Sequence, residues 1–243
     1  MTFVHQQLRA GGWVAPWLRF QNQSRYEWAA RFVEGCRVAE VGCGGGHGTA
    51  RLSAAGATHV DGFDIDSEAV THAQDIHGSA RLAFQVAPAG SIPADDGSYD
   101  LVVSLETIEH VEDDLGYVRE IGRIVRPGGT LLCTTPNRLV TNPGKTIHDK
   151  PFNPHHIREY TAEELRECLS ECFSKVELLG QSPYRSTYVK RLGSVGRRLP
   201  KVAVKVHQLR KLLGIPWESI EHHRPRIVPR DREPEVLAAI CQR

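Results

Sequence analysis

A glycine-rich turn constrains the fold of this chain more than any other feature. The stretch VAEVGCGGGHGT places Gly42, Gly44 and Gly46 between a short apolar run and the start of a helical pattern. Glycine permits the backbone conformations of a tight turn, and without a Cβ its backbone N–H groups can approach a ligand at a helix N-terminus. The stretch therefore predicts strand, turn and helix. The Gly-x-Gly-x-Gly spacing alone suits a plain tight turn as well as a nucleotide-binding loop.

Acidic residues end a second predicted strand, over 58–66, some twenty positions after the turn. A carboxylate at this place can accept hydrogen bonds from both hydroxyls of a nucleoside ribose, and we assign that role to Asp64. Ser67 is predicted to cap the following helix, which runs to about Ile76. Asp66 has the structural alternative of a helix-start carboxylate favoured by the helix dipole.

Strand and helix patterns alternate along the rest of the chain. Helices are predicted over 113–125, closed by residues 126–129, and from 161 to about 172, and further strands over 82–86, 99–104, 130–134, 174–181 and 235–242. This alternation predicts an α/β fold with a doubly wound sheet and right-handed crossovers. Ligands bind such sheets at the carboxyl ends of the strands, where the turn, Asp64, the loop from Ala87 and residues 105–111 would converge.

Four ordered segments resemble the class I S-adenosylmethionine-dependent methyltransferases. They are VAEVGCGGGHGT, VDGFDID, IPADDGSYDLVVSLETIEHVED and IGRIVRPGGTLLCTTPN, and they lie within residues 36–137. The resemblance implies a Rossmann-like sheet of seven strands, the last antiparallel, with helical insertions. It also implies S-adenosylmethionine as the cofactor and methyl donor.

The resemblance assigns individual residues to this cofactor. They are Glu40, Gly42, Cys43, Gly44, Gly46, Asp64, Ile65, Ala87 and Glu106. Glu40 and the glycine turn would line the methionine portion, Asp64 would hold the ribose, and Ile65 would pack on adenine. Glu106 would lie near the methionine end or the reaction centre. The family often has an acid after the third strand to accept from the adenine amino group, but here Pro88 stands between two alanines. That contact must be missing, supplied by backbone or taken over by another residue.

The acceptor side is expected in a long connection over residues 135–161. A loop of this length in a compact domain is usually functional or disordered, and its Pro, Asn and His content suggests an ordered loop at the mouth of the cofactor site. The segments TPNR and NPHHIREYTAEEL resemble methyltransferases acting on sugars, glycolipids and other hydroxyl-bearing metabolites, which have a histidine at the position of His156. A capping box at Thr161 and Glu164 is predicted to open the next helix.

Methyl transfer to a hydroxyl benefits from a general base, and histidine suits that role near neutral pH. The candidate catalytic residues are His110 and His156, with His155 a third choice and Glu106 an orienting carboxylate. Each histidine has the alternative of packing beside the cofactor without reacting. The expected reaction is methylation of a small hydroxyl-bearing metabolite, such as a sugar, glycolipid or natural product, at oxygen before nitrogen.

The sequence predicts no metal centre. A metal site formed by Asp113 and Asp114 near His110 is the alternative. The six cysteines are scattered without a C-x-x-C pair. They are expected to be reduced, buried thiols rather than disulfide partners or zinc ligands.

The chain is expected to form one methyltransferase domain. Its predicted parts are an N-terminal helical cover (1–34), the cofactor-binding core (35–182), a basic helical lid (183–234) and the last strand (235–243). With 30 basic and 29 acidic residues, overall charge gives no reason to expect nucleic acid or an anionic membrane as partner. A signal peptide and a membrane span are not evident, so a cytoplasmic protein with a small-molecule substrate is expected, and homo-oligomerisation is left open.

Three alternatives remain at this stage. A nicotinamide-dependent oxidoreductase could use the same sheet, and a non-catalytic cofactor-binding subunit could act within an assembly. An RNA or protein methyltransferase could use the basic residues of the lid, including Arg197 and Arg198. A solvated amphipathic lid or a subunit contact is the simpler interpretation of that basic run, ahead of a site for an acidic substrate or a membrane surface.

Overall fold

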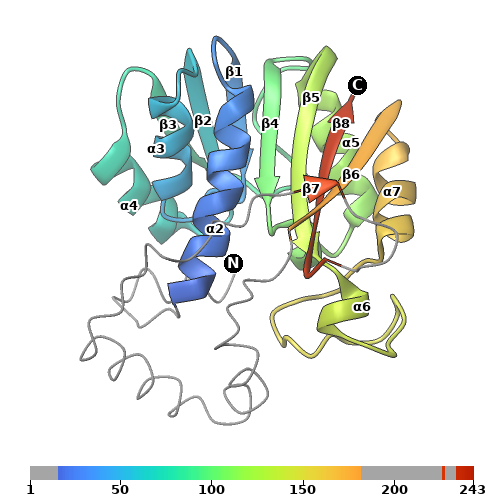
Figure 1. Ribbon diagram of the computed structural model, residues 1–243. Coiled ribbons are helices and arrows are strands. Elements are labelled where there is room, and N and C mark those ends of the chain that lie inside the picture. The colour runs from blue at the N-terminus through green and yellow to red at the C-terminus, as the bar shows by residue number, and fades with distance from the viewer. Residues whose placement is uncertain (1–15, 182–225, 228–233) are drawn as a thin grey trace, which may run out of the picture.

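A mixed β-sheet in the order β3-β2-β1-β4-β5-β8-β6-β7 forms the centre of the molecule (Figure 1). The computed structural model describes residues 16–181, 226–227 and 234–243. The seven long strands are β1 (Arg37–Val41), β2 (His59–Asp64), β3 (Leu82–Val86), β4 (Tyr99–Leu105), β5 (Val125–Pro136), β6 (Lys175–Gln181) and β8 (Val236–Gln242). Strand β8 runs antiparallel between β5 and β6, and the two-residue β7 (Arg226–Ile227) adds to the edge beside β6. The predicted doubly wound, Rossmann-like sheet with an antiparallel last strand is confirmed.

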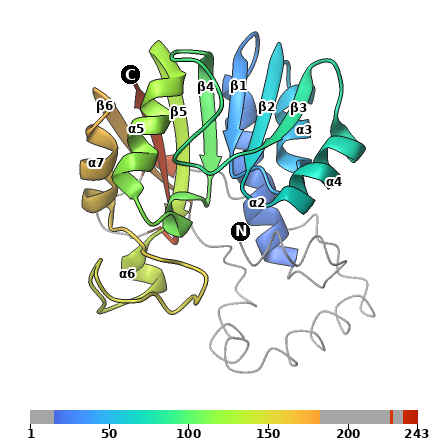
Figure 2. The ribbon, with the colours of Figure 1, turned by 180° about the vertical axis from the view of Figure 1, so that it is seen from behind.

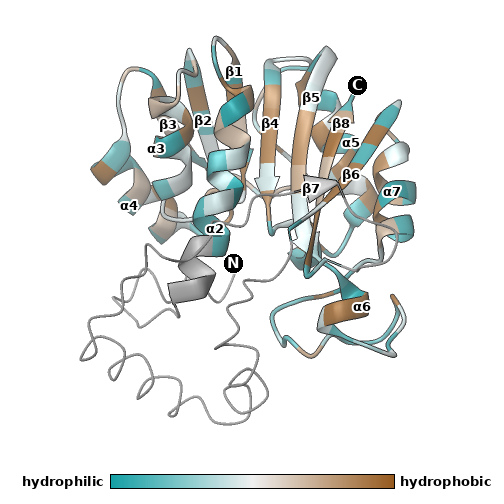
Figure 3. Cartoon of the chain, viewed as in Figure 1, coloured by the Kyte–Doolittle hydropathy of each residue, from teal (hydrophilic) through white to brown (hydrophobic). Residues whose placement is uncertain are grey.

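Helices cover both faces of this sheet (Figures 1 and 2). One face carries α2 (Pro16–Ala29), the short helix η1 (Ala30–Phe32), α3 (His47–Ala54) and α4 (Ser67–His77), and the other carries α5 (Asp114–Ile124) and α7 (Ala162–Ser170). Two apolar cores result. Trp28 and Leu52 pack in the first, and Tyr117 and Leu165 in the second. The central strands β4 and β5 are hydrophobic over most of their length because side chains on both of their faces are covered (Figure 3).

Of two helix N-caps predicted from the sequence, one is confirmed and the other is wrong by one residue. The capping box at Thr161 is confirmed, since Glu164 Oε2 accepts from the Thr161 backbone N–H at 2.7 Å and the Thr161 side chain accepts in return. The prediction that Ser67 caps α4 is wrong. Asp66 is the cap, with extended backbone and Oδ1 accepting from the N–H groups of Glu68 and Ala69, both at 3.0 Å.

Strand β5 is longer than the sequence suggested. Residues 126–129 were expected to separate a helix from a strand starting at Thr130, but β5 already pairs with β4 at Val125. The register shifts before Leu101 pairs with Thr130, so the Pro-Gly-Gly step lies within the strand as an irregularity. At its other end β5 reaches Pro136, which carries the chain directly into the acceptor-side loop.

The predicted basic lid lies outside the described residues, apart from β7 and Pro234, and so does the first part of the N-terminal cover. In the described part of the chain, no helix has the length and apolar character needed to cross a membrane. All six cysteines are free thiols, four of them buried and Cys36 and Cys172 partly exposed.

Candidate active site

The turn between β1 and α3 requires glycine at several positions. Gly42, Gly44 and Gly46 have φ angles of 84°, 52° and 75°, a backbone region that other residues rarely adopt. A Cβ on Gly46 would also lie 2.7 Å from the Phe84 ring. Gly45 differs, because its φ is not positive and no atom of the described residues lies within 4 Å of a Cβ added there. The backbone at Gly45 is therefore open to close approach by a ligand.

Asp64 ties this turn to the end of β2. Its buried carboxylate accepts from the Gly44 N–H at 2.7 Å and from the Asp66 N–H at 2.9 Å, one bond to each oxygen. Each oxygen retains acceptor capacity for a further hydrogen bond. The neighbouring Ile65 side chain is 69% exposed, and the buried Ala87 donates its N–H to the Asp64 carbonyl at 3.0 Å. The residues expected at ribose and adenine thus lie side by side.

Glu40 lies beneath the turn, and both of its oxygens are engaged within the protein. Tyr26 Oη donates to Oε1 at 2.6 Å and Thr49 Oγ1 donates to Oε2 at 2.5 Å, which joins α2 and α3 to β1. Burial, with a smaller effect of Asp64, raises the pKa of Glu40 to about 7. Cys43 is also buried, and burial raises the pKa of its thiol. Glu40 and Cys43 therefore support the turn from the protein interior.

Glu106 follows β4 and is held in place by two neighbours. Its φ is 55°, and within the described part of the chain it is the one non-glycine residue with a positive φ. Thr134 Oγ1 donates to Oε1 at 3.0 Å, and the Arg25 guanidinium lies 3.4 Å from Oε2. The sequence did not predict this role for Arg25. The available signal was a cation within the aromatic N-terminal segment, and the contact joins two residues 81 positions apart in the sequence.

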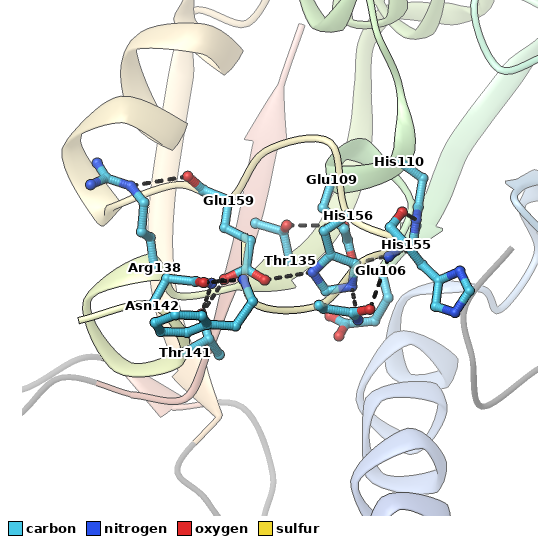
Figure 4. Close-up of polar contacts among 12 residues, drawn as sticks. Glu106, Glu109, His110, Thr135, Arg138, Thr141, Asn142, His155, His156 and Glu159 are labelled. Atoms are coloured by element: carbon cyan, nitrogen blue, oxygen red, sulfur yellow. Dashed lines mark hydrogen bonds and ion pairs between the residues drawn. The ribbon is translucent and has the colours of Figure 1, made fainter. Parts of the chain in front are cut away.

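A compact group of ionisable side chains forms beyond Glu106 (Figure 4). Glu109 and His110 lie on the short helix η2 (Ile108–His110) after β4. Glu109 is fully buried; Thr135 Oγ1 donates to its Oε2 at 3.0 Å, while Oε1 has no hydrogen-bond partner among the described residues. Burial, reinforced by the Glu106 charge, raises the pKa of Glu109. Glu109 is not among the site residues predicted from the sequence, although it directly precedes the candidate histidine His110.

His110 faces Glu109 with one nitrogen and the acceptor-side loop with the other. Its Nδ1 is 2.8 Å from the His155 carbonyl oxygen, so Nδ1 carries the proton and donates it. Its Nε2 lies 4.0 Å from Glu109 Oε1 and has no partner in the described structure. Burial lowers the pKa of His110 to about 4. The candidate His155 therefore contributes its backbone carbonyl to this arrangement.

His156 packs edge-on against His110, with ring centroids 4.9 Å apart. Its Nδ1 is 2.5 Å from Glu159 Oε1, and its Nε2 is 2.8 Å from Asn153 Nδ2. Glu159 is buried and also accepts from Thr141 and Asn142. Burial favours the neutral acid, but the hydrogen bond from His156 and those from the other donors outweigh it and lower the pKa of Glu159.

The loop over residues 135–161 is ordered and packs against η2. It contains the short helix α6 (Arg138–Thr141), capped by Asn137, and the Ile157 N–H donates to the Glu109 carbonyl at 2.8 Å. The predicted ordered loop is thus present, and the buried Glu159 organises it. The sequence did not identify Glu159, because its partners lie up to 18 positions away along the loop.

The structure brings both candidate histidines together. Potential ligand atoms of Glu109, His110 and His156 all lie within 4.8 Å of one another. The two aspartates considered near His110 are used elsewhere: Asp113 caps α5 through the Gly116 N–H at 2.8 Å, and Asp114 accepts from Tyr160 Oη at 2.9 Å.

Comparison with known proteins identifies the family. A model described as the methyltransferase domain matches residues 39–133. A probable S-adenosylmethionine-dependent methyltransferase of Mycobacterium tuberculosis is 34% identical over 202 residues, which cover 83% of this chain and 69% of that relative. The chain belongs to the S-adenosylmethionine-dependent methyltransferases. This membership removes the oxidoreductase alternative and gives S-adenosylmethionine as the methyl donor.

Other similarities to this methyltransferase differ in how much they cover. A probable S-adenosylmethionine-dependent methyltransferase of Mycolicibacterium smegmatis is 38% identical over 161 residues, covering 66% of this chain but only 60% of that relative. A ubiquinone biosynthesis O-methyltransferase of Aromatoleum aromaticum is 30% identical over 187 residues, covering 71% of this chain and 80% of that relative. A solved structure of a Thermotoga maritima S-adenosylmethionine-dependent methyltransferase, described as a possible histamine N-methyltransferase, has a TM-score of 0.64 to this chain at 15% sequence identity. The match covers 98% of this chain and 97% of that chain, and it shows that the two share a fold.

The donor side of the methyltransferase suits its cofactor. The backbone at Gly45 is open, Asp64 has unused acceptor capacity, and Ile65 presents an exposed apolar surface beside it. At the position of the missing adenine acid, Pro88 is exposed and Ala87 is buried. After β3 the Ala87 N–H already donates to the Asp64 carbonyl, and the Pro88 carbonyl accepts from the Ser91 N–H at 2.9 Å.

Proposed function

We propose that this methyltransferase methylates a hydroxyl group of a small metabolite. The observation that carries the proposal is a pair of buried atoms, Glu109 Oε1 and His110 Nε2, which have no hydrogen-bond partner among the described residues and lie 4.0 Å apart after β4. A carboxyl oxygen and an imidazole nitrogen this close together suit a substrate group that can both donate and accept a hydrogen bond, as a hydroxyl does. The similarity to a ubiquinone biosynthesis O-methyltransferase supports the same acceptor class.

On the donor side we assign the residues as follows. Gly44, Gly45 and Gly46 would approach the methionine portion, with Gly42, Cys43 and Glu40 supporting the turn from within. Asp64 would accept from the ribose hydroxyls, Ile65 would cover adenine, and backbone near Ala87 would meet the adenine amino group. Arg25, oriented by Glu106, would supply the cation for the methionine carboxylate. When bound, the cofactor supplies an electrophilic methyl group on a sulfonium sulfur.

On the acceptor side, His110 is the first candidate for the base. Its Nδ1–H is directed to the His155 carbonyl, which leaves the Nε2 lone pair free to accept the hydroxyl proton. His156 is the second candidate, because its Nε2 already meets the Asn153 amide. Glu159 would position His156, and alignment of nucleophile and methyl carbon would contribute much of the rate.

A reaction on RNA or protein remains the competing proposal. It rests on the basic segment 183–234, which lies outside the described residues apart from β7 and Pro234, as do Arg197 and Arg198. That segment stays a predicted lid, and the single-domain organisation and any homo-oligomer likewise stay proposals. Salt-sensitive RNA binding that disappears in an R197A/R198A variant would support the competing proposal.

The direct experiment uses S-adenosylmethionine with a labelled methyl group. Purified protein is incubated with sugars, phenols and lipid-linked hydroxyl compounds, each paired with its amine analogue as a matched control. We expect label in an ether product that survives mild base, with the amine analogue labelled more slowly. Label found only in amines, RNA or protein would contradict the proposed acceptor class.

A further inference from the structure

Three side chains meet at the acceptor side with their inner atoms close together. Potential ligand atoms of Glu109, His110 and His156 lie within 4.8 Å of one another, and their side chains are buried or nearly so. Two of these inner atoms, Glu109 Oε1 and His110 Nε2, have no hydrogen-bond partner in the described structure. Buried polar atoms without partners are rare, because leaving one unsatisfied costs about 1–3 kcal/mol. The arrangement therefore calls for a ligand that satisfies both atoms.

The outer atom of each side chain is held by a separate group. Thr135 Oγ1 donates to Glu109 Oε2 at 3.0 Å, and His110 Nδ1 donates to the His155 carbonyl at 2.8 Å. His156 Nδ1 contacts the Glu159 carboxylate at 2.5 Å. Histidines that bind metals usually donate their second ring N–H to a carboxylate or carbonyl in this way, which fixes the tautomer and aims the other nitrogen at the ion.

The inner atoms are close to a coordinating distance. Ligands about 2.1 Å from one ion lie at most about 4.2 Å apart, so Glu109 Oε1 and His110 Nε2, 4.0 Å apart, and the third ligand atom, within 4.8 Å of both, would draw together around an ion. One hydrogen bond must also change. Asn153 Nδ2 lies 2.8 Å from His156 Nε2, and an ion would displace this amide. The neighbouring Asn153 Oδ1 is held by the His155 N–H at 3.1 Å, so only one end of the Asn153 side chain faces the group.

We propose that Glu109, His110 and His156 bind one divalent transition-metal ion of the Zn²⁺ type. Two imidazoles and one carboxylate are a common donor set for zinc, with further positions open to solvent or substrate. Mg²⁺ and Ca²⁺ prefer oxygen ligands, so the two imidazoles select against them. The predicted absence of a metal centre followed from sequence spacing, which does not show that His156 lies beside His110.

The catalytic consequence of this site rests on the proposed function. An acceptor hydroxyl bound to the ion would lose its proton more readily to water, and its oxygen would then form the new bond to the methyl carbon as the carbon–sulfur bond breaks. In this state the two histidines are ligands, and the ion replaces the general base. Binding of the ion itself does not depend on which substrate is methylated.

The test is equilibrium dialysis of chelator-treated, full-length protein against Zn²⁺, Co²⁺ or Mg²⁺ alone, followed by metal analysis. We expect one bound Zn²⁺ or Co²⁺ per chain above the control level, visible absorption bands from bound Co²⁺, and no comparable Mg²⁺ binding. E109Q and H156Q should lower Zn²⁺ affinity by at least about 10-fold. The matched control is H47A, because His47 lies 3.2 Å from His77 in a surface histidine pair.

A second variant guards against misfolding of the ligand variants. T135V keeps all three ligands but removes the donor to Glu109 Oε2, and we expect about 10-fold weaker Zn²⁺ binding. Absence of Zn²⁺ binding to wild-type protein, or equal binding by wild type, E109Q and T135V, would overturn the site. Metal-loaded protein that methylates no hydroxyl compound would instead overturn the proposed function and leave the site standing, so the two failures are distinguishable.

Discussion

The donor and acceptor sides of this methyltransferase lie at the same edge of the sheet but are built differently. On the donor side, Asp64 and Glu40 have both oxygens engaged by backbone N–H groups or hydroxyls. On the acceptor side, Glu109 and His110 each present a buried atom with no described partner. The ribose end of the donor side can therefore form without a ligand, whereas Arg25 Nε at its methionine end and the two acceptor-side atoms leave polar capacity for one. Changes on each side should accordingly affect different steps.

The largest expected effect is on the acceptor side. H110N retains an amide that can donate to the His155 carbonyl but removes the inward nitrogen, Nε2. We expect kcat to fall by about 10²–10⁴-fold, the usual range for loss of an acid–base group, with unchanged S-adenosylmethionine affinity. Steady-state kinetics and cofactor titration measure the two quantities.

The control for this prediction is H155A, which keeps the backbone carbonyl that orients His110. Its kcat should stay within a few-fold of wild type. If H110N weakens cofactor binding as much as it lowers kcat, the proposed separation between the two sides is wrong.

The next effect concerns stability on the donor side. The folded-state pKa of Glu40 is about 7, against 4.5 without burial, so the folded protein retains a proton that the unfolded chain loses as pH rises. Stability should therefore fall between pH 4.5 and 7 by roughly 3 kcal/mol from this group. E40Q should lack that decline. Urea unfolding of both proteins across this range tests it, and a pH-independent difference between them would contradict it.

The glycine turn offers a matched pair with opposite outcomes. G46A should destabilise the fold by about 2–3 kcal/mol, because alanine disfavours a φ of 75° and its Cβ would meet Phe84. G45A should leave stability within about 0.5 kcal/mol but weaken cofactor binding, because its Cβ enters open space on the ligand side. Equal S-adenosylmethionine affinity in G45A and wild type would show that the cofactor does not approach Gly45.

The smallest expected effect comes from Glu159, a positioning residue. E159Q removes the charge that orients His156 but keeps the shape of the buried side chain. We expect kcat to fall by about 10-fold and the KM for the acceptor to change little. A purely structural role would lower thermal stability but leave kcat per folded molecule unchanged. Active-site titration counts the folded molecules and so distinguishes the two roles.

The contrast between the two sides also explains what could be predicted from the sequence. The glycine turn, Asp64 and the capping box at Thr161 are local patterns, and the physical requirements behind them act within a few residues. Even there, Asp66 and Ser67 are adjacent and both suited to cap a helix, and only the backbone geometry decides in favour of Asp66.

The acceptor side depends on contacts between distant segments. Arg25 meets Glu106, Thr135 meets Glu109, and His110 meets the His155 carbonyl 45 positions later. No periodicity or spacing encodes these pairs, because they arise from how the loop folds back on η2. The histidines could be selected as types of residue suited to catalysis, but their convergence with Glu109 required the structure.

The most direct test of the separation between donor and acceptor sides is isothermal titration of S-adenosylmethionine into wild type, D64A and E109Q. Loss of the two ribose hydrogen bonds should weaken binding by D64A by about 10²–10⁴-fold, since hydrogen bonds to charged groups contribute about 1.5–3 kcal/mol each. E109Q should bind the cofactor as wild type does, because Glu109 belongs to the acceptor side. If E109Q weakens cofactor binding as much as D64A, or if D64A binds normally, the assignment of the two sides is wrong.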